Sequence, residues 1–164
     1  MKIIALRIFY VLLVLVALVA VIVGIEYFGG QPMGLFSGSR PANLGFSAGK
    51  FAPPSWKPNS VSSTVEKSDP HYIAPLTFSG ASADAWSKLQ GIVKASPAIN
   101  VVTNRANYLH AEFKSAGMGF VDDVEFALDE SASAVHVRSA SRLGVRDFDV
   151  NRARIESLRA QFAK

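Results

Sequence analysis

The residues best able to do chemistry lie in the stretch from Tyr108 to Arg142, where apolar and polar residues alternate. An alternation with a period of two is typical of β-strands, because successive side chains point to opposite faces of the sheet. Two turn-like breaks rich in Gly, Asp and Ser divide the stretch into three strands. If neighbouring strands pair at these turns, His110 lies beside Glu125, and Glu125 lies beside Arg138.

The row formed by His110, Glu125 and Arg138 is expected on the outer, polar face of the sheet. The same pairing brings Glu112 close to Asp123. Such a row could bind an anionic or zwitterionic ligand, and His110 would change protonation near neutral pH. The alternative is a solvated sheet face with cross-strand ion pairs, each worth less than about 1 kcal/mol. The sequence favours this second interpretation, because such pairs are common on exposed sheets.

Asp122 is the exception to the alternation, because it falls on the apolar face. A buried carboxylate is costly unless it is paired and hydrogen-bonded, so we expect Arg142, Arg152 or a backbone N–H as its partner. The pair would either lock the sheet to the final helix or contact a ligand. A metal site at Asp122, Asp123 and Glu125 is not expected, since adjacent strand residues point to opposite faces.

Familiar catalytic and cofactor motifs are absent from the sequence. There is no G-x-S-x-G, no H-E-x-x-H, no phosphate-binding glycine loop and no dinucleotide fingerprint. An S-x-x-K match at 47–50 lies among glycines and prolines, outside the helix start that this motif requires. The chain has no Cys, which excludes thiolate chemistry. We therefore expect no catalytic residue, no metal and no cofactor. The net charge of +4 is mild, and the basic residues are not interleaved with aromatics, so no nucleic-acid partner is expected.

Two helices and five strands are predicted around these residues. Strands are predicted at 71–78, 98–103, 108–115, 120–128 and 134–142. Helices at 82–95 and 150–162 follow from the apolar stripes Trp86, Leu89, Ile92 and Val93, and Ile155, Leu158 and Phe162. Ser82 and Asp149 are expected to cap their N-termini. The fold class is α+β, in the order β-α-β-β-β-β-α, with one curved antiparallel sheet and both helices on one face.

The first part of the chain predicts a membrane anchor. Residues 8–27 are almost entirely apolar and long enough to cross a bilayer. Lys2 and Arg7 precede this run, so the N-terminus is expected in the cytoplasm. A cleaved signal peptide is the alternative, but the run is longer than such peptides use and lacks a small-x-small site.

Three regions follow from this pattern. They are a transmembrane signal anchor at 1–28, a tether rich in Gly and Pro at 29–57, and an extracytoplasmic (periplasmic) domain at 58–164. Some aromatic residues of the tether are expected on the membrane surface or against the domain. The lipid bilayer is the expected partner of residues 8–27, and an envelope protein or a lipid is the expected partner of the domain.

Six motifs carry a resemblance to a known family. They are PNSVSS from Pro58, D-x-HYI-x-PL from Asp69, YLHAEF from Tyr108, GFVDDVEF from Gly119, VRSASR-x-G from Val137 and NR-x-RIE from Asn151. From Pro58 to the C-terminus the chain resembles the uncharacterised family called domain of unknown function fourteen-ninety-nine. The family often has Cys at the position of Ser60 and Leu-Gly at Phe148-Asp149, which implies a local difference at the start of the last helix.

The resemblance implies a domain but no substrate, because no activity is established for the family. Its polar motif positions, together with the sheet pattern, define the candidate ligand-binding residues as His110, Asp122, Glu125, Arg138, Arg142, Asn151 and Arg152. Three functions remain open. The leading one is a non-enzymatic, membrane-tethered domain that binds partners or organises the envelope. The second is a small-ligand or lipid-binding module that uses the cleft between sheet and helices. The third, a hydrolase using Asp122 and His110, requires both on one face, against the alternation.

Overall fold

The structure, a computed structural model, describes residues 2–28, 36–116 and 118–164. The described residues form three helices, α1 (Lys2–Phe28), α2 (Ser82–Lys94) and α3 (Val150–Phe162). They also form eight strands, β1 (Phe46–Ser47), β2 (Lys50–Phe51), β3 (Ser60–Ser62), β4 (Leu76–Thr77), β5 (Ile99–Asn104), β6 (Tyr108–Lys114), β7 (Val121–Asp129) and β8 (Ala134–Ser141). The fold is α+β with an antiparallel sheet and one N-terminal apolar helix, as the sequence predicts.

The main sheet is a meander from β5 to β8, extended at one edge by two short strands. Its order is β3-β8-β7-β6-β5, and β4 pairs with another part of β8. The strand predicted over 71–78 is thus only two residues long, because Pro75 has no N–H to give to a neighbouring strand. The remaining length of that edge is taken by β3, which the sequence did not predict.

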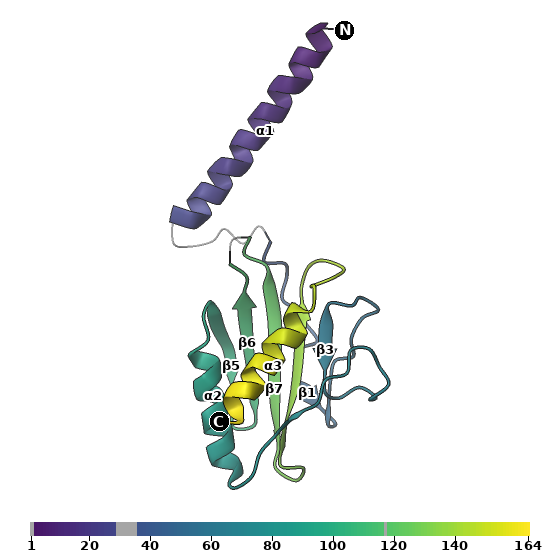
Figure 1. Cartoon of the computed structure of the whole chain (residues 1–164), viewed down its shortest axis with the longest axis vertical. Coiled ribbons are helices and arrows are strands. Elements are labelled where there is room, and N and C mark those ends of the chain that lie inside the picture. The colour runs from purple at the N-terminus through teal and green to yellow at the C-terminus, as the bar shows by residue number, and fades with distance from the viewer. Residues whose placement is uncertain (1, 29–35, 117) are drawn as a thin grey trace.

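Helices α2 and α3 lie across one face of the sheet (Figure 1). Between them and the strands lies a filled core, in which Leu89, Val93, Phe126 and Ile155 have no exposed surface. The apolar stripes predicted for the two helices are the faces that enter this core. The cleft between sheet and helices that a ligand-binding module would need is therefore occupied by the protein's own side chains.

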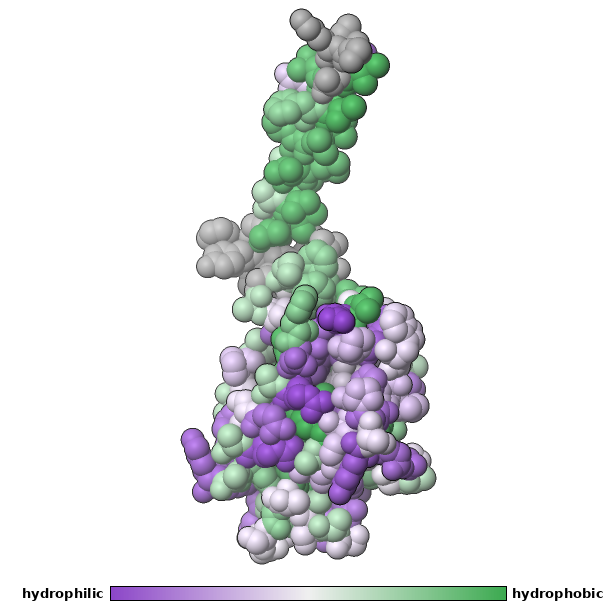
Figure 2. Space-filling model, turned by 45° about the vertical axis from the view of Figure 1, so that its right-hand side comes forward, coloured by the Kyte–Doolittle hydropathy of each residue, from purple (hydrophilic) through white to green (hydrophobic). Residues whose placement is uncertain are grey.

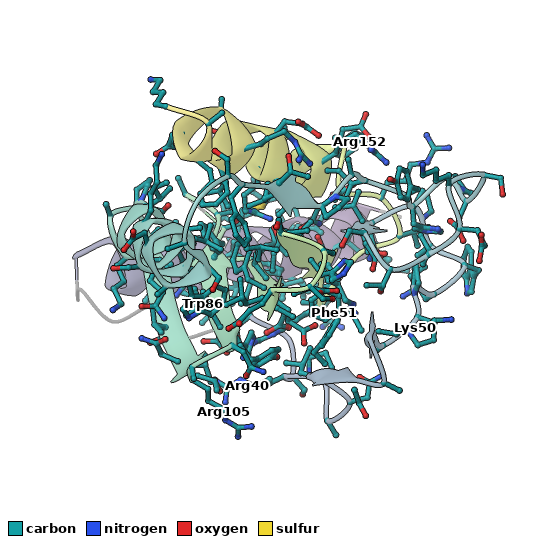
Figure 3. The ribbon with its side chains drawn as sticks, turned by 90° about the horizontal axis from the view of Figure 1, so that it is seen from below. Arg40, Lys50, Phe51, Trp86, Arg105 and Arg152 are labelled. Atoms are coloured by element: carbon teal, nitrogen blue, oxygen red, sulfur yellow. The ribbon has the colours of Figure 1, made fainter. Side chains whose placement is uncertain are left out.

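A third layer covers the opposite, outer face of the sheet (Figure 3). It consists of the chain from residue 36 to the hairpin of β1 and β2, and we call it the cover segment (residues 36–51). Phe46 stacks on His136 with ring centroids 5.7 Å apart, and Phe51 is buried. Within the predicted tether at 29–57, residues 29–35 lie outside the described residues, and the cover segment contacts the sheet through Arg40, Gly45 and Phe46.

Helix α1 stands clear of the domain (Figure 1). Its window Leu6–Val23 has a mean hydropathy of 3.0, and no part of that window is buried. At a rise of 1.5 Å per residue, 27 residues extend about 40 Å, more than the roughly 30 Å of bilayer hydrocarbon. By length and composition α1 could cross a membrane as a span or a signal anchor.

The cap predicted for α2 is wrong, and the cap predicted for α3 is right in position but makes no side-chain hydrogen bond. Ser82 is the first residue of α2, and Ala81 occupies the cap position without a side-chain hydrogen bond. Asp149 is the residue before α3, but its side chain makes no cap bond, and the Asp147 carboxylate accepts the Asn151 N–H at 2.9 Å instead. Phe148 and Asp149 both have positive φ, so this loop adopts left-handed backbone where the related family often has Gly.

Two glycines of similar exposure should respond oppositely to the same substitution. Gly91 lies inside α2 with open space around an added Cβ, so Gly91→Ala should stabilise the domain by about 0.5–1 kcal/mol. Gly80 also has open space but a φ of +86°, so Gly80→Ala should destabilise it by about 1 kcal/mol. Urea unfolding of the full chain in detergent, followed by the fluorescence of the buried Trp86, measures both. Equal effects of one sign would contradict the assigned backbone.

Candidate functional site

The predicted row of polar residues exists, and its strand register is the expected one. His110 pairs with Glu125 and Glu125 with Arg138, while Glu112 pairs with Asp123. Together with Arg142 these side chains form what we call the outer-face cluster, which lies between the sheet and the cover segment. The members are His110, Glu112, Asp123, Glu125, Arg138 and Arg142.

Asp123 is the centre of the outer-face cluster. Arg142 binds it with two hydrogen bonds of 2.8 Å, from Nε to Oδ2 and from Nη2 to Oδ1, and His110 Nε2 lies 2.8 Å from Oδ1. Burial by itself raises the pKa of Asp123, but the hydrogen bonds from Arg142 and His110 outweigh it and hold that pKa below its ordinary value. Asp123 is therefore a charged group with a fixed partner.

Glu112 connects this centre to the cover segment. It accepts hydrogen bonds from Arg40 Nε at 2.8 Å, from Asn100 Nδ2 at 2.9 Å and from Arg142 Nη2. Burial opposes ionisation, but these three donors together lower the pKa of Glu112 to about 2. Arg40 belongs to the cover segment, so this carboxylate ties the third layer to the sheet.

Glu125 makes the second connection between the sheet and the cover segment. Its carboxylate has no exposed surface and accepts three hydrogen bonds of 2.7 Å, from the Gly45 N–H, the Tyr108 hydroxyl and Arg138 Nη1. Burial, and then the hydrogen bond to Glu125, raise the pKa of Tyr108 well above its ordinary value. Both oxygens of Glu125 are thus occupied within the fold.

The expectation that this row faces solvent is wrong. His110 is 3% exposed, Asp123 1% and Glu125 0%, because the cover segment lies over them. Alternation shows on which side of a sheet a residue lies, but it does not show what else covers that side. Tyr108 and the glycines around position 45 gave no signal of this contact in the sequence.

Asp122 lies on the opposite face, as predicted, in a second group that we call the helix-face cluster: Asp122, Ser139, Ser141, Asn151 and Arg154. Its partner is Arg154, whose Nη2 lies 2.5 Å from Oδ2 and whose guanidinium lies over the Phe113 ring at 5.1 Å. The expected partners Arg142 and Arg152 are wrong. Arg142 is on the other face, and Arg152 donates to the carbonyls of Tyr72 and Pro70.

Asn151 holds the helix-face cluster together and has no exposed surface. Its Nδ2 donates to the Asn59 carbonyl at 3.1 Å and to Ser141 Oγ at 2.9 Å, while its Oδ1 accepts from Arg154 Nη1 at 2.8 Å and from Ser139 Oγ. Arg154 was missed by the sequence reasoning. Arg154 lies three residues after Asn151, which places both on one helix face, so this spacing could have indicated Arg154 as a member of the site.

Few polar side chains of the two clusters are free to take part in a reaction. Three carboxylates of the outer face meet the guanidinium groups of Arg40, Arg138 and Arg142. Within the described part of the chain, Trp86 Nε1 is the buried side-chain polar atom that lacks a partner, and no group of three His, Asp or Glu could hold a metal. Asp122 and His110 lie on opposite faces, so the two-residue hydrolase is excluded.

Comparison with known protein families identifies the domain. The model of the family DUF1499, described as a protein of unknown function, matches residues 50–162. The chain belongs to this family. No curated protein matches it at a significant level. The DUF1499 match contains all members of both clusters, whereas Arg40 and Gly45, which bond to the outer-face cluster, lie before it in the earlier part of the cover segment.

The low pKa of Glu112 predicts how acid acts on the DUF1499 domain. A carboxyl whose pKa falls from 4.5 to about 2 on folding stabilises the native state above pH 4.5, and this contribution is lost as the pH falls toward 2. Glu112→Gln should therefore lower the free energy of unfolding by about 1–3 kcal/mol at pH 7. The loss should shrink toward pH 2.

Urea unfolding between pH 7 and pH 2 measures this effect. Glu130→Gln is the matched control, since Glu130 lies in an exposed turn and carries no side-chain ion pair with a described residue. A loss of the same size at pH 7 and pH 2.5 would contradict the ionic role of Glu112.

Proposed function

We propose that this DUF1499 protein is a single-pass membrane protein whose domain lies outside the cytoplasm and serves as a non-enzymatic binding or envelope-organising module. The observation that carries the proposal is helix α1. Its window Leu6–Val23 is strongly apolar and buries none of its surface against the domain. Such a surface is stable in a bilayer, where the helix also satisfies its own backbone hydrogen bonds.

The orientation rests on the charges beside the helix. Lys2 and Arg7 lie at its N-terminal end, and Glu26 lies near its C-terminal end. Basic residues favour the cytoplasmic side, so the domain that follows α1 would be exported, to the periplasm in a bacterial envelope. The bilayer is then the partner of α1, and an envelope protein or lipid is the partner of the domain.

The non-enzymatic part of the proposal is supported by the two clusters. A catalytic acid or base needs a free side chain within reach of a substrate. Asp123 and Glu125 are instead bonded on both oxygens, and Asn151 is bonded through both its amide nitrogen and its oxygen. These groups support the fold in the way that buried, satisfied polar networks do.

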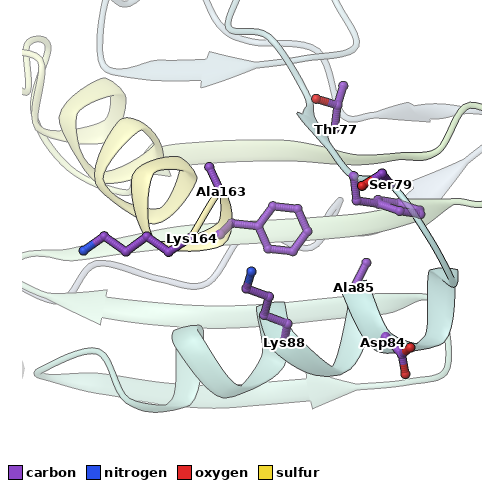
Figure 4. A pocket seen from close by; sticks show the side chains of 9 residues that line it. Thr77, Ser79, Asp84, Ala85, Lys88, Ala163 and Lys164 are labelled. Carbon is purple, nitrogen blue, oxygen red and sulfur yellow. The ribbon is translucent and has the colours of Figure 1, made fainter.

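The second candidate, ligand binding between sheet and helices, has less support. The space there is filled by the core. A cleft of about 610 Å³ does lie at the surface between α2 and α3, lined by Asp84, Lys88, Phe162 and Lys164 among others (Figure 4). This cleft is polar and shallow in character, without the apolar enclosure typical of small-molecule sites.

Thiol labelling tests the topology, since the native chain has no Cys. Ala132 lies in the exposed turn between β7 and β8, so Ala132→Cys should react with a membrane-impermeant maleimide in cells with a permeabilised outer membrane. Ile3→Cys, which keeps both Lys2 and Arg7, should react only after the inner membrane is broken. Labelling of Ile3→Cys alone before lysis would contradict the orientation. Recovery of the chain in the soluble fraction would contradict the anchor.

A further inference from the structure

One end of the domain carries an apolar surface that the fold leaves open. It lies where β6 ends, β7 begins and β8 ends, beside the first turn of α3. We call it the end surface, and it is formed by Met118, Phe120, Leu143, Val145, Phe148 and Val150. Several of these residues line an apolar cavity of about 370 Å³.

The exposure of the end surface is concentrated rather than scattered. In the described residues 36–116 and 118–164, the large exposed apolar side chains are at this end, with Trp56 as the exception. Phe148 is 89% exposed and Met118 58%. Phe148 also has a φ of 53°, a backbone conformation that a bulky residue adopts at a cost. Contiguous apolar exposure of this kind marks an interaction surface.

The end surface is also the part of the domain nearest to the bilayer proposed above. Phe36 packs on Phe120 with ring centroids 5.2 Å apart, and seven residues separate it from Phe28, the last residue of α1. A chain of that length reaches at most about 28 Å. Figures 1 and 2 show this end of the domain turned toward the apolar helix.

We propose that the end surface docks onto the lipid bilayer that α1 crosses, an inference that rests on the proposed membrane anchor. Apolar side chains at such a surface enter the boundary of headgroups and acyl chains by about 5–10 Å. Arg146, in the same loop, has no ion pair with a described residue and can meet lipid phosphates. The domain is thereby held in one orientation, with its β7–β8 turn away from the membrane.

The test uses the full chain in liposomes of phosphatidylethanolamine and phosphatidylglycerol that contain a doxyl-labelled lipid, a short-range quencher. Val145→Cys carries a bimane fluorophore on the end surface, and Ala132→Cys carries it at the opposite end of the sheet. The label at 145 should lose about half of its fluorescence and the label at 132 almost none, because only the end surface enters the lipid.

A second substitution separates docking from mere proximity. Phe148→Asp with Met118→Asp should return the label at 145 to the low quenching seen at 132, since carboxylates are costly to place among acyl chains and are repelled by the anionic phosphatidylglycerol. Asp also tolerates the left-handed backbone at 148, so the loop should keep its shape. Phe148→Leu is the matched control and should leave the quenching unchanged.

Three outcomes would overturn the proposal. They are equal quenching at 145 and 132, quenching at 145 that survives the two Asp substitutions, and disulfide cross-linking of Val145→Cys chains in place of quenching, which would assign the surface to a second copy. Flotation of the liposomes separates these failures from that of the proposed function. A chain that does not float contradicts the anchor, whereas a floating chain without quenching contradicts docking alone.

Discussion

The pairing of Asp123 with Arg142 is the interaction on which the layered structure depends. A buried carboxylate without a partner costs several kcal/mol, whereas one that meets a bidentate guanidinium is tolerated. Here the pair lies beneath the cover segment, with Asp123 only 1% exposed. Because Arg142 also binds Glu112, and Glu112 binds Arg40, one chain of charges joins the sheet to the layer that covers it.

This network changes how the proposed membrane helix relates to the domain. The cover segment belongs to the folded unit, through the bonds of Arg40 to Glu112 and of Gly45 to Glu125. Seven residues therefore separate α1 from the first described residue of that unit, in place of a tether of about thirty. In the proposed arrangement, a connection of this length keeps the apolar end of the domain near the bilayer, where the exposed Phe148 would meet lipid.

Much of the fold was predictable because its signals are local. The alternation in β6, β7 and β8 gave the register of His110 with Glu125 and of Glu125 with Arg138, and the helical stripes gave α2 and α3. The misplaced charge of Asp122 was also visible, since a two-residue period assigns every strand residue to a face. The family resemblance was confirmed over residues 50–162.

The remaining features depend on contacts between distant segments, which periodicity does not encode. Nothing in the sequence around Gly45 indicates that its N–H meets Glu125, eighty residues away. The partner of Asp122 depended on the rotation of α3, which brings Arg154 rather than Arg152 to the sheet. The cap of α3 differed because Phe148 and Asp149 are left-handed, so that Asp147 reaches the helix N-terminus. For these reasons the outer-face cluster was expected to meet solvent, whereas Asp122 of the helix-face cluster was correctly expected to be buried but was given the wrong partners.

A double-mutant cycle on Asp123 and Arg142 tests most directly whether the outer-face cluster supports the fold. The free energy of unfolding is measured for Asp123→Asn, Arg142→Gln and the double variant, in the full chain in detergent. The account predicts that each single substitution destabilises the domain and that the coupling energy is about 2–3 kcal/mol. A coupling near zero, or a rise in stability after either single substitution, would contradict it, because a gain in stability on replacement marks a residue kept for function at the expense of the fold.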